Sequence, residues 1–189
     1  MQKKENIIHL MNIQKIIEDI EVSKAENNYP KAKEIALEAL KHHTDDYRLY
    51  EELADIYLFE WNIDKASEVL SVARDLHPES GTGMYLDGYL ATARWEFERA
   101  IEILAKANQL MPNNAEILRN LGWAHVMKWE LMKWLSLLRR AYILAPDEPM
   151  VINDLSVALI AAWQESEART VLARLGQSDL VDTVKNSEI

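Results

Sequence analysis

The chain has 189 residues, and 49% of them are apolar, which is enough for one compact domain or one solenoid with its own core. Its net charge is −10 and no basic stripe is visible, so we expect it to bind neither nucleic acid nor an anionic membrane surface. Cysteine is absent, which excludes disulfides and thiol chemistry, and no apolar run is long enough to span a membrane. We see no secretory signal at the N-terminus, and together these features favour a cytoplasmic protein.

The hydrophobic pattern predicts helices along the whole chain. The first is expected over residues 4–27, and a turn at 27–30 leads to a second helix that ends near residue 42. The polar run 43–46 can cap the third helix. Later helices are expected at 47–60, 64–77, 81–94, 98–111, 115–128, 132–145, 149–162 and 165–175. A short helix over 179–185 would cover the last apolar face.

The helices repeat at an interval of 34 residues, without insertions. The best copy covers 115–148 and carries Leu118, Leu121, Gly122, His125, Trp134, Leu138, Ala141 and Pro146. The equivalent places one interval earlier hold Met84, Gly88, Ala91, Ala100, Leu104, Ala107 and Pro112. Small residues at Ala66, Ala100 and Ala168 let the two helices of a pair approach closely, and proline ends the second helix.

This spacing resembles the tetratricopeptide repeat (TPR), although His125 replaces the usual aromatic residue and Trp134 the usual alanine. The resemblance covers about residues 13–176 and implies an all-α, right-handed TPR superhelix (α-solenoid) of five helix-turn-helix repeats. We expect a single domain over 1–189. Its repeats would be 13–46, 47–80, 81–114, 115–148 and 149–176, with 177–189 as a C-terminal cap or tail.

Four tryptophans follow the same interval, each at the break between two paired helices: Trp61, Trp95, Trp129 and Trp163. The TPR family usually has glycine there, because this residue ends a helix and often takes a left-handed conformation. One interpretation is that the turn is helical enough for tryptophan and that each ring packs over a hairpin. A second is that the rings form an exposed edge for contact with another molecule.

The third interpretation is that these tryptophans are not native. A gene that uses UGA for glycine yields this sequence if UGA is read as tryptophan. Glycine would also suit position 134, where the helices cross. Trp123, which follows Leu121 and Gly122, is expected to be a native tryptophan. Only 5 glycines remain in the chain, which is a low number.

The histidines offer no pattern of a metal site or a catalytic site. His42 and His43 are adjacent at a helix end and therefore point apart, and His125 holds a core position. The glycines at 81 and 83 lack the spacing of a phosphate-binding loop. We therefore predict no catalytic residue, no metal and no cofactor, and we do not expect an enzyme.

The resemblance implies that the second, fifth, ninth, twelfth and thirteenth residues of each repeat face a concave groove. The predicted protein-binding residues are Arg48, Glu51, Asp55, Tyr85, Tyr89, Arg119, Trp123 and Asn153. Val126, Met127, Ile160 and Ala161 are expected to pack within the coil instead. The acidic and apolar residues of the first repeats do not fit the carboxylate clamp of chaperone-binding TPR domains.

These features predict a non-enzymatic adaptor that holds a peptide or a helix of a partner protein in the groove. The ligand is expected to carry apolar anchors and some positive charge. The alternative is a self-assembling scaffold, a homo-oligomer formed through the solenoid ends or through the edge that carries Trp61, Trp95, Trp129 and Trp163.

Overall fold

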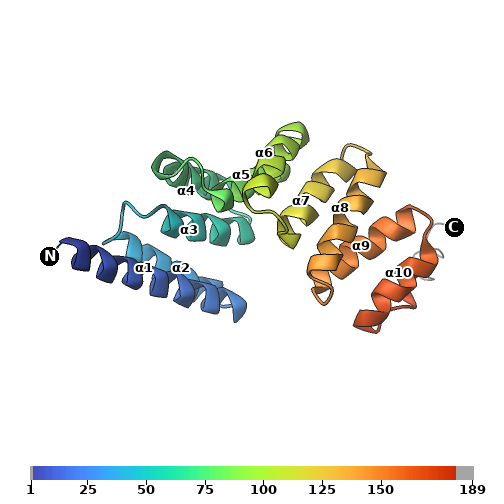
Figure 1. The fold of residues 1–189 in the computed structure, drawn as a ribbon, viewed down its shortest axis with the longest axis horizontal. Coiled ribbons are helices and arrows are strands. Elements are labelled where there is room, and N and C mark those ends of the chain that lie inside the picture. The colour runs from blue at the N-terminus through green and yellow to red at the C-terminus, as the bar shows by residue number, and fades with distance from the viewer. Residues whose placement is uncertain (1, 182–189) are drawn as a thin grey trace. The chain divides into compact units, whose positions relative to one another are not determined.

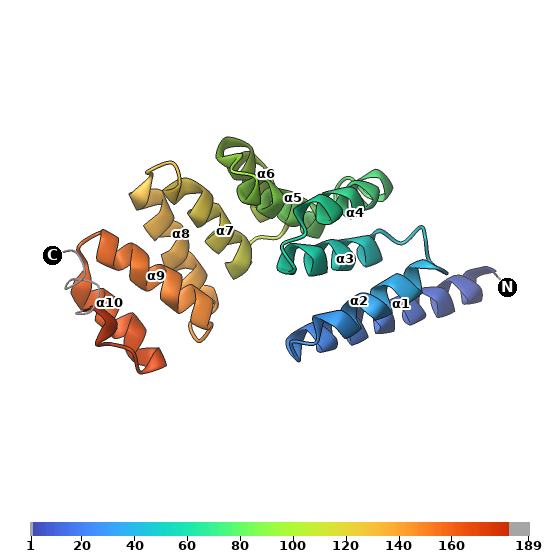
Figure 2. The ribbon, with the colours of Figure 1, turned by 180° about the vertical axis from the view of Figure 1, so that it is seen from behind.

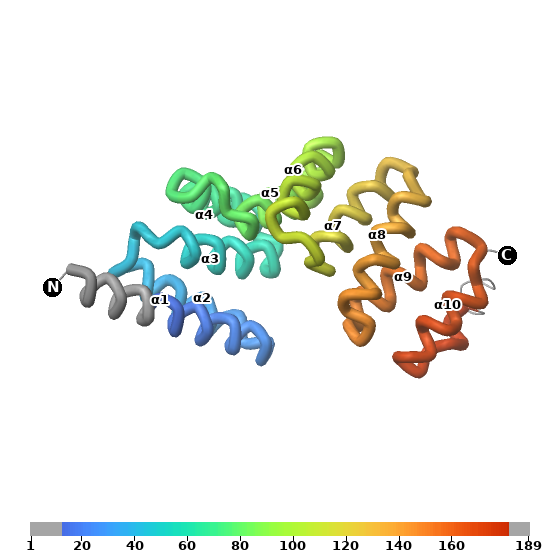
Figure 3. Tube along the Cα trace, viewed as in Figure 1, coloured from blue at the N-terminus to red at the C-terminus, as the bar shows by residue number. Residues whose placement is uncertain are grey.

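The computed structural model describes the backbone of residues 2–181 and the side chains of residues 13–181, and its regular elements within that range are all helices (Figures 1 and 3). The α-helices are α1 (Gln2–Ala25), α2 (Tyr29–Leu40), α3 (Tyr47–Phe59), α4 (Ile63–Leu76), α5 (Gly81–Ala93), α6 (Phe97–Leu110), α7 (Ala115–Val126), α8 (Leu131–Leu144), α9 (Pro149–Ala161) and α10 (Glu165–Leu172). A short 3-10 helix, η1 (Ala173–Leu175), follows α10. The predicted helices are thus confirmed, with ends that differ by one to three residues.

The helices begin at the predicted interval. First helices of successive repeats start at residues 47, 81, 115 and 149, and second helices start at 29, 63, 97, 131 and 165. The chain divides into two compact units, residues 1–93 with α1 to α5 and residues 94–189 with α6 to α10 and η1. The predicted organisation as a single domain stays a prediction.

In the first unit, α1 and α2 lie side by side and α3 packs against both (Figures 1 and 2). Isoleucines at 13, 17 and 20 of α1 meet Ala32 and Ala36 of α2 and the buried face of α3. A second cluster joins α3, α4 and α5 through Leu58, Leu70 and Leu86. The first helices α1 and α3 therefore each bury one side against their own partner and another side against the next repeat.

The second unit repeats this scheme. The α6 helix packs on α7, α7 on α8, α8 on α9 and α9 on α10, in chain order (Figure 2). Its largest cluster includes Leu138, Leu155 and Leu172. Val181 is fully buried in the same cluster and residues 180–181 are helical, so the chain contributes to this core beyond α10, and the predicted cap stays a prediction. The remainder of the helix expected over 179–185 lies outside the described residues.

The position where the two helices of a repeat are expected to cross holds a small residue in four of the five repeats. Ala32, Ala66, Ala100 and Ala168 are all fully buried. In the fourth repeat the same position holds Trp134, which is also buried. A side chain larger than alanine pushes the helices of a pair apart unless the neighbouring residues make room for it.

Several helix starts are capped by short polar side chains. The Asn28 side chain accepts a hydrogen bond from the Lys31 N–H, and Asp46 accepts one from the Arg48 N–H. The Asn114 side chain accepts from the N–H groups of Glu116 and Ile117. These caps satisfy N–H groups that the helix leaves without partners, and they fix where each helix begins.

Glu51 was predicted to line the groove, and the structure contradicts this. Its side chain is buried beneath the start of α5, beside the Ser80 hydroxyl and the Gly83 N–H. A β-carbon at position 83 would lie 2.8 Å from the Glu51 Oε1 atom, so this approach depends on glycine. Burial raises the pKa of Glu51 by more than the nearby Ser80 hydroxyl and Gly83 N–H lower it, and its Oε1 atom is buried with no hydrogen-bond partner in the described structure. Glu51 is therefore an interior residue that joins α3 to α5.

We predict that Ala32→Leu destabilises the protein by about 1–3 kcal/mol, because the added atoms overfill the crossing of α1 and α2. Chemical denaturation followed by far-UV circular dichroism measures the change. Ala25→Leu is the matched control, since Ala25 is exposed in the last turn of α1. Equal stability of the two variants would contradict the close crossing.

We also predict that Glu51→Gln stabilises the protein at pH 7, by roughly 1 kcal/mol. The pKa of Glu51 is higher in the folded state than in the unfolded state, so stability is greatest when Glu51 is protonated and falls as pH rises through the folded-state pKa. Glutamine has nearly the same size as glutamate and stays neutral at every pH, so it avoids the cost of a buried charge. Its advantage should vanish as pH falls below the ordinary glutamate value of 4.5.

The measurement is the unfolding free energy at a series of pH values from 4 to 8. Glu34→Gln, at an exposed position of α2, controls for the change of residue type. An advantage of Glu51→Gln that does not depend on pH would show that burial of charge is not its cause.

Candidate functional site

Predicted groove residues of the first unit are mostly engaged within it. The Arg48 guanidinium pairs with the Asp46 carboxylate through two bonds of 2.9 and 2.7 Å. Tyr85 and Tyr89 are partly buried and pack against the cluster that joins α3, α4 and α5. They present only part of each ring on the surface.

Asp55 takes part in a network between α1 and α3. The Lys24 ammonium donates to Asp55 at 2.7 Å and to Glu52 at 2.8 Å. Burial lowers the pKa of Lys24, but the two carboxylates raise it by more, so its net pKa lies above the ordinary value. Burial also raises the pKa of Glu52, against the effect of Lys24. This network ties the first repeat to the second and leaves Asp55 half-exposed.

The second unit brings two predicted residues together around a third. The Trp123 indole N–H donates to Asp154 Oδ2 at 3.1 Å, and Arg119 lies 3.4 Å from the same oxygen. Burial raises the pKa of Asp154, although its bonds to Trp123 and Arg119 act in the opposite direction. Arg119 also contacts the Met150 sulfur at 3.5 Å. Side chains of α7 and α9 are thus fixed to one another.

Exposed apolar side chains surround this cluster. Trp123 of α7 and Met127, which caps the end of α7, are each 38% exposed, and Met150 and Val157 of α9 are 52% and 54% exposed. Met127 follows Trp123 by four residues and Val157 follows Asp154 by three, so helical spacing places each pair on one side of its helix. We call this surface the α7–α9 face: Arg119, Trp123, Met127, Met150, Asp154 and Val157.

Two features of this face were not predicted. Asp154 was missed. It follows Arg119 by one repeat interval plus one residue, and the first helices of the two repeats bring these two positions close together. Met127 was expected to pack within the coil, as was Ala161, and both are exposed. Val126 and Ile160 do pack against the core of the second unit, as expected. Asn153 is exposed, and its predicted place in a binding groove stays a prediction.

The four tryptophans at the hairpin turns are exposed. Trp61, Trp95, Trp129 and Trp163 are 71%, 71%, 93% and 82% exposed, and all four have positive φ angles, between 56° and 64°. The interpretation that the turn is helical and that each ring packs over a hairpin is therefore wrong. Their use as a contact edge stays a prediction.

Ionisable groups elsewhere do not gather into a reactive centre in the part of the chain that the structure describes. His125 is half-buried and its Nδ1 atom bonds to the Glu130 carboxylate, which agrees with a packed, hydrogen-bonded histidine. Among residues 13–181, no group of three or more histidines and carboxylates is placed to hold a metal ion. No helix of the described chain is both long and apolar enough to span a bilayer.

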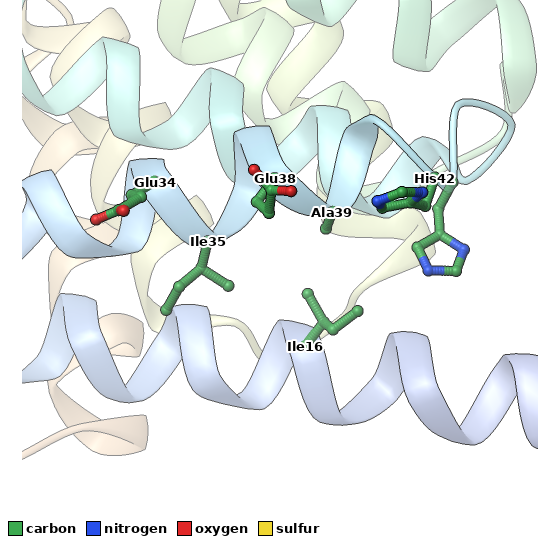
Figure 4. A pocket seen from close by; sticks show the side chains of 7 residues that line it. Ile16, Glu34, Ile35, Glu38, Ala39 and His42 are labelled. Atoms are coloured by element: carbon green, nitrogen blue, oxygen red, sulfur yellow. The ribbon is translucent and has the colours of Figure 1, made fainter.

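A depression of about 580 Å³ lies between α1 and α2 (Figure 4). Ile16 of α1 and Ile35 of α2 point toward each other across it, and Glu34, Glu38 and His42 stand along one side. None of the residues predicted to bind a partner lines it. Its apolar floor continues the contact between the two helices, so it is an open part of the packing between them.

Solved structures of similar fold identify the architecture. The chain is similar to TTC0263, a thermophilic TPR protein of Thermus thermophilus, with a TM-score of 0.74 and 18% identity over 92% of this chain and 97% of that one. It is also similar to PilF of Pseudomonas aeruginosa, with a TM-score of 0.70 and 18% identity over 87% and 75% of the two chains.

A third similar structure is a chain of the Cut9–Hcn1 hetero-tetramer of the APC/C, with a TM-score of 0.75 and 17% identity over 86% of this chain and 32% of that one. No family model matches the sequence, and no curated protein matches it. The predicted class is nevertheless confirmed by the helices and by these structures. The chain has the all-α solenoid fold of the tetratricopeptide repeat.

Proposed function

We propose that this protein is a non-enzymatic adaptor that binds a peptide or a helix of a partner protein on the α7–α9 face. The observation that carries the proposal is the set of apolar side chains exposed there, Trp123, Met127, Met150 and Val157, around a fixed polar centre. Large apolar side chains held on rigid helices supply contact area with little loss of conformational freedom.

The charge of the chain favours a ligand with positive groups. The net charge is −10, and the Arg119 guanidinium is already next to Asp154. A cationic segment with apolar anchors would be steered toward the protein by charge and held by apolar contacts. Protein–protein association also suits the fold, since the similar Cut9 chain was solved as a complex with Hcn1.

We predict that Met150→Ser with Val157→Ser weakens peptide binding about tenfold, because it removes apolar contact worth about 1.4 kcal/mol. The probes are synthetic peptides of one length with two leucines, flanked by lysines, by glutamines or by glutamates. Fluorescence anisotropy measures the affinities. The lysine series should bind best, and its advantage should shrink as salt is added.

The matched control is Met132→Ser with Ile143→Ser, which removes comparable apolar groups from exposed positions of α8. This control should bind as the unmodified protein does. Equal weakening by both double variants, or binding that is unchanged by the first, would contradict the assignment to the α7–α9 face.

Self-assembly remains the second candidate function, because the exposed rings at the hairpin turns form apolar surface. Size measurement across a concentration series distinguishes the two functions. An adaptor stays monomeric across the series, and a scaffold grows with concentration.

A further inference from the structure

The left-handed residues of this chain fall into two groups. Within residues 2–181, positive φ angles occur at Asn27, Asn113 and Gly176 and at the four tryptophans of the hairpin turns. Glycine carries no side chain to clash in this conformation, and asparagine is the residue that tolerates it next best. Tryptophan is bulky, and at positive φ it is a genuine outlier.

Asn27 lies one repeat interval before Trp61, and the two have φ angles of 57° and 56°. The first repeat therefore meets the same requirement with a residue that suits it. In both turns the left-handed N–H donates to the carbonyl three residues earlier, and the next N–H donates to the carbonyl five residues earlier. The turns at Trp129 and Trp163 have the same pair of bonds, as does the turn at Gly176. This is the Schellman motif, which glycine normally completes.

The indole rings do not compensate for this conformation. The four rings are between 71% and 93% exposed, so most of each ring lies in water. Trp95 lies edge-on to Phe97, with the ring centroids 5.7 Å apart, and it is still 71% exposed. The backbone hydrogen bonds alone explain the turn, and the tryptophan side chain adds only the free-energy cost of the left-handed conformation.

Trp134 is also poorly suited to its position, which is the crossing position of the repeat and not the turn. The other four repeats have a fully buried alanine there. The Trp134 indole nitrogen is buried with no hydrogen-bond partner in the described structure, which is costly for a donor. A β-carbon on Gly122 would lie 3.0 Å from the Trp134 ring, so the ring is packed closely against α7.

Trp123 is the contrasting case. It lies inside α7, and its indole N–H donates to Asp154. Five of the six tryptophans thus occupy places where the fold requires glycine or another very small residue, and one occupies a place that satisfies tryptophan.

We infer that the native residue at positions 61, 95, 129, 134 and 163 is glycine, specified by UGA codons that are read as tryptophan in this sequence. A single change of codon meaning accounts for all five positions and leaves Trp123 as it is. The apolar edge formed by the four exposed rings then disappears, and self-assembly through that edge disappears with it. The inference does not depend on the proposed function, because no residue of the α7–α9 face changes.

The codons of the native gene test this inference directly. We expect UGA at all five positions and UGG at position 123. Peptide masses of the protein purified from its native source should then show glycine at the five positions and tryptophan at 123. UGG codons at the five positions, or native peptides that contain tryptophan there, would overturn the inference.

Stability provides an independent test of the strain. Each of Trp61→Gly, Trp129→Gly and Trp163→Gly should raise the ratio of folded to unfolded protein roughly fivefold, since relief of the left-handed conformation exceeds the entropy cost of glycine. Denaturant unfolding of the purified variants measures these ratios.

Two matched variants show whether the gain is specific. Asn27→Gly should change the ratio little, because asparagine already tolerates the same conformation. Trp123→Gly should lower it, because it removes the bond to Asp154 and places glycine inside α7. No gain at any of the three turns, or an equal gain from Asn27→Gly, would show that tryptophan is not strained there.

Discussion

Each helix pair of this chain has to reverse direction within a few residues and still bring its two helices into close contact. In the fourth repeat α7 ends at Val126 and α8 begins at Leu131, so the whole reversal takes four residues. One left-handed residue makes this possible, because its own N–H and the N–H of the next residue then donate to the last carbonyls of the helix. Because the repeat interval is constant, α7 and α9 lie side by side within the second unit, and their equivalent positions gather on one surface. The α7–α9 face exists for that reason.

The fold was predictable because its determinants are local and repeat. Asn28 and Asp46 cap helices through atoms only two or three residues away, and alanine marks the crossing points in four of the five repeats. The interval of 34 residues could therefore be read before any contact was known. Position within the repeat also pointed to Trp123 and Arg119, which the structure brings together at Asp154.

Burial and charge pairing between repeats could not be read in the same way. Glu51 holds a position that was expected to face the groove, yet the chain before α5 covers it, and the absence of a side chain at Gly83 allows this. The assignment of groove residues by their position within a repeat contains no information about the loop that precedes the next repeat. Asp154 was missed because its partners lie 31 and 35 residues earlier. Opposite charges separated by one interval plus one residue are the pattern that would have indicated it.

The tryptophans show a different limit. The sequence left three interpretations open because composition does not determine a φ angle. The turn conformation is set by hydrogen bonds of the main chain, and these persist whatever side chain is attached. A residue that suited the turn would have agreed with its backbone, as Asn27 does. The first repeat has the same turn backbone with a residue that suits it. The mismatch between tryptophan and the left-handed backbone at the equivalent positions therefore indicates that the residue, and not the backbone, is unusual.

Charges on the first helices mainly join neighbouring repeats. Lys24 connects α1 to Glu52 and Asp55 of α3, and Arg119 connects α7 to Asp154 of α9. A ligand that competed for these groups would leave a partly buried charge without its partner, which costs more than a new surface ion pair returns. If a ligand binds the α7–α9 face as we propose, its affinity has to come from the apolar side chains around the polar centre. The acidic surface acts at longer range, where it favours cationic ligands through the rate of association more than through the strength of the final contact.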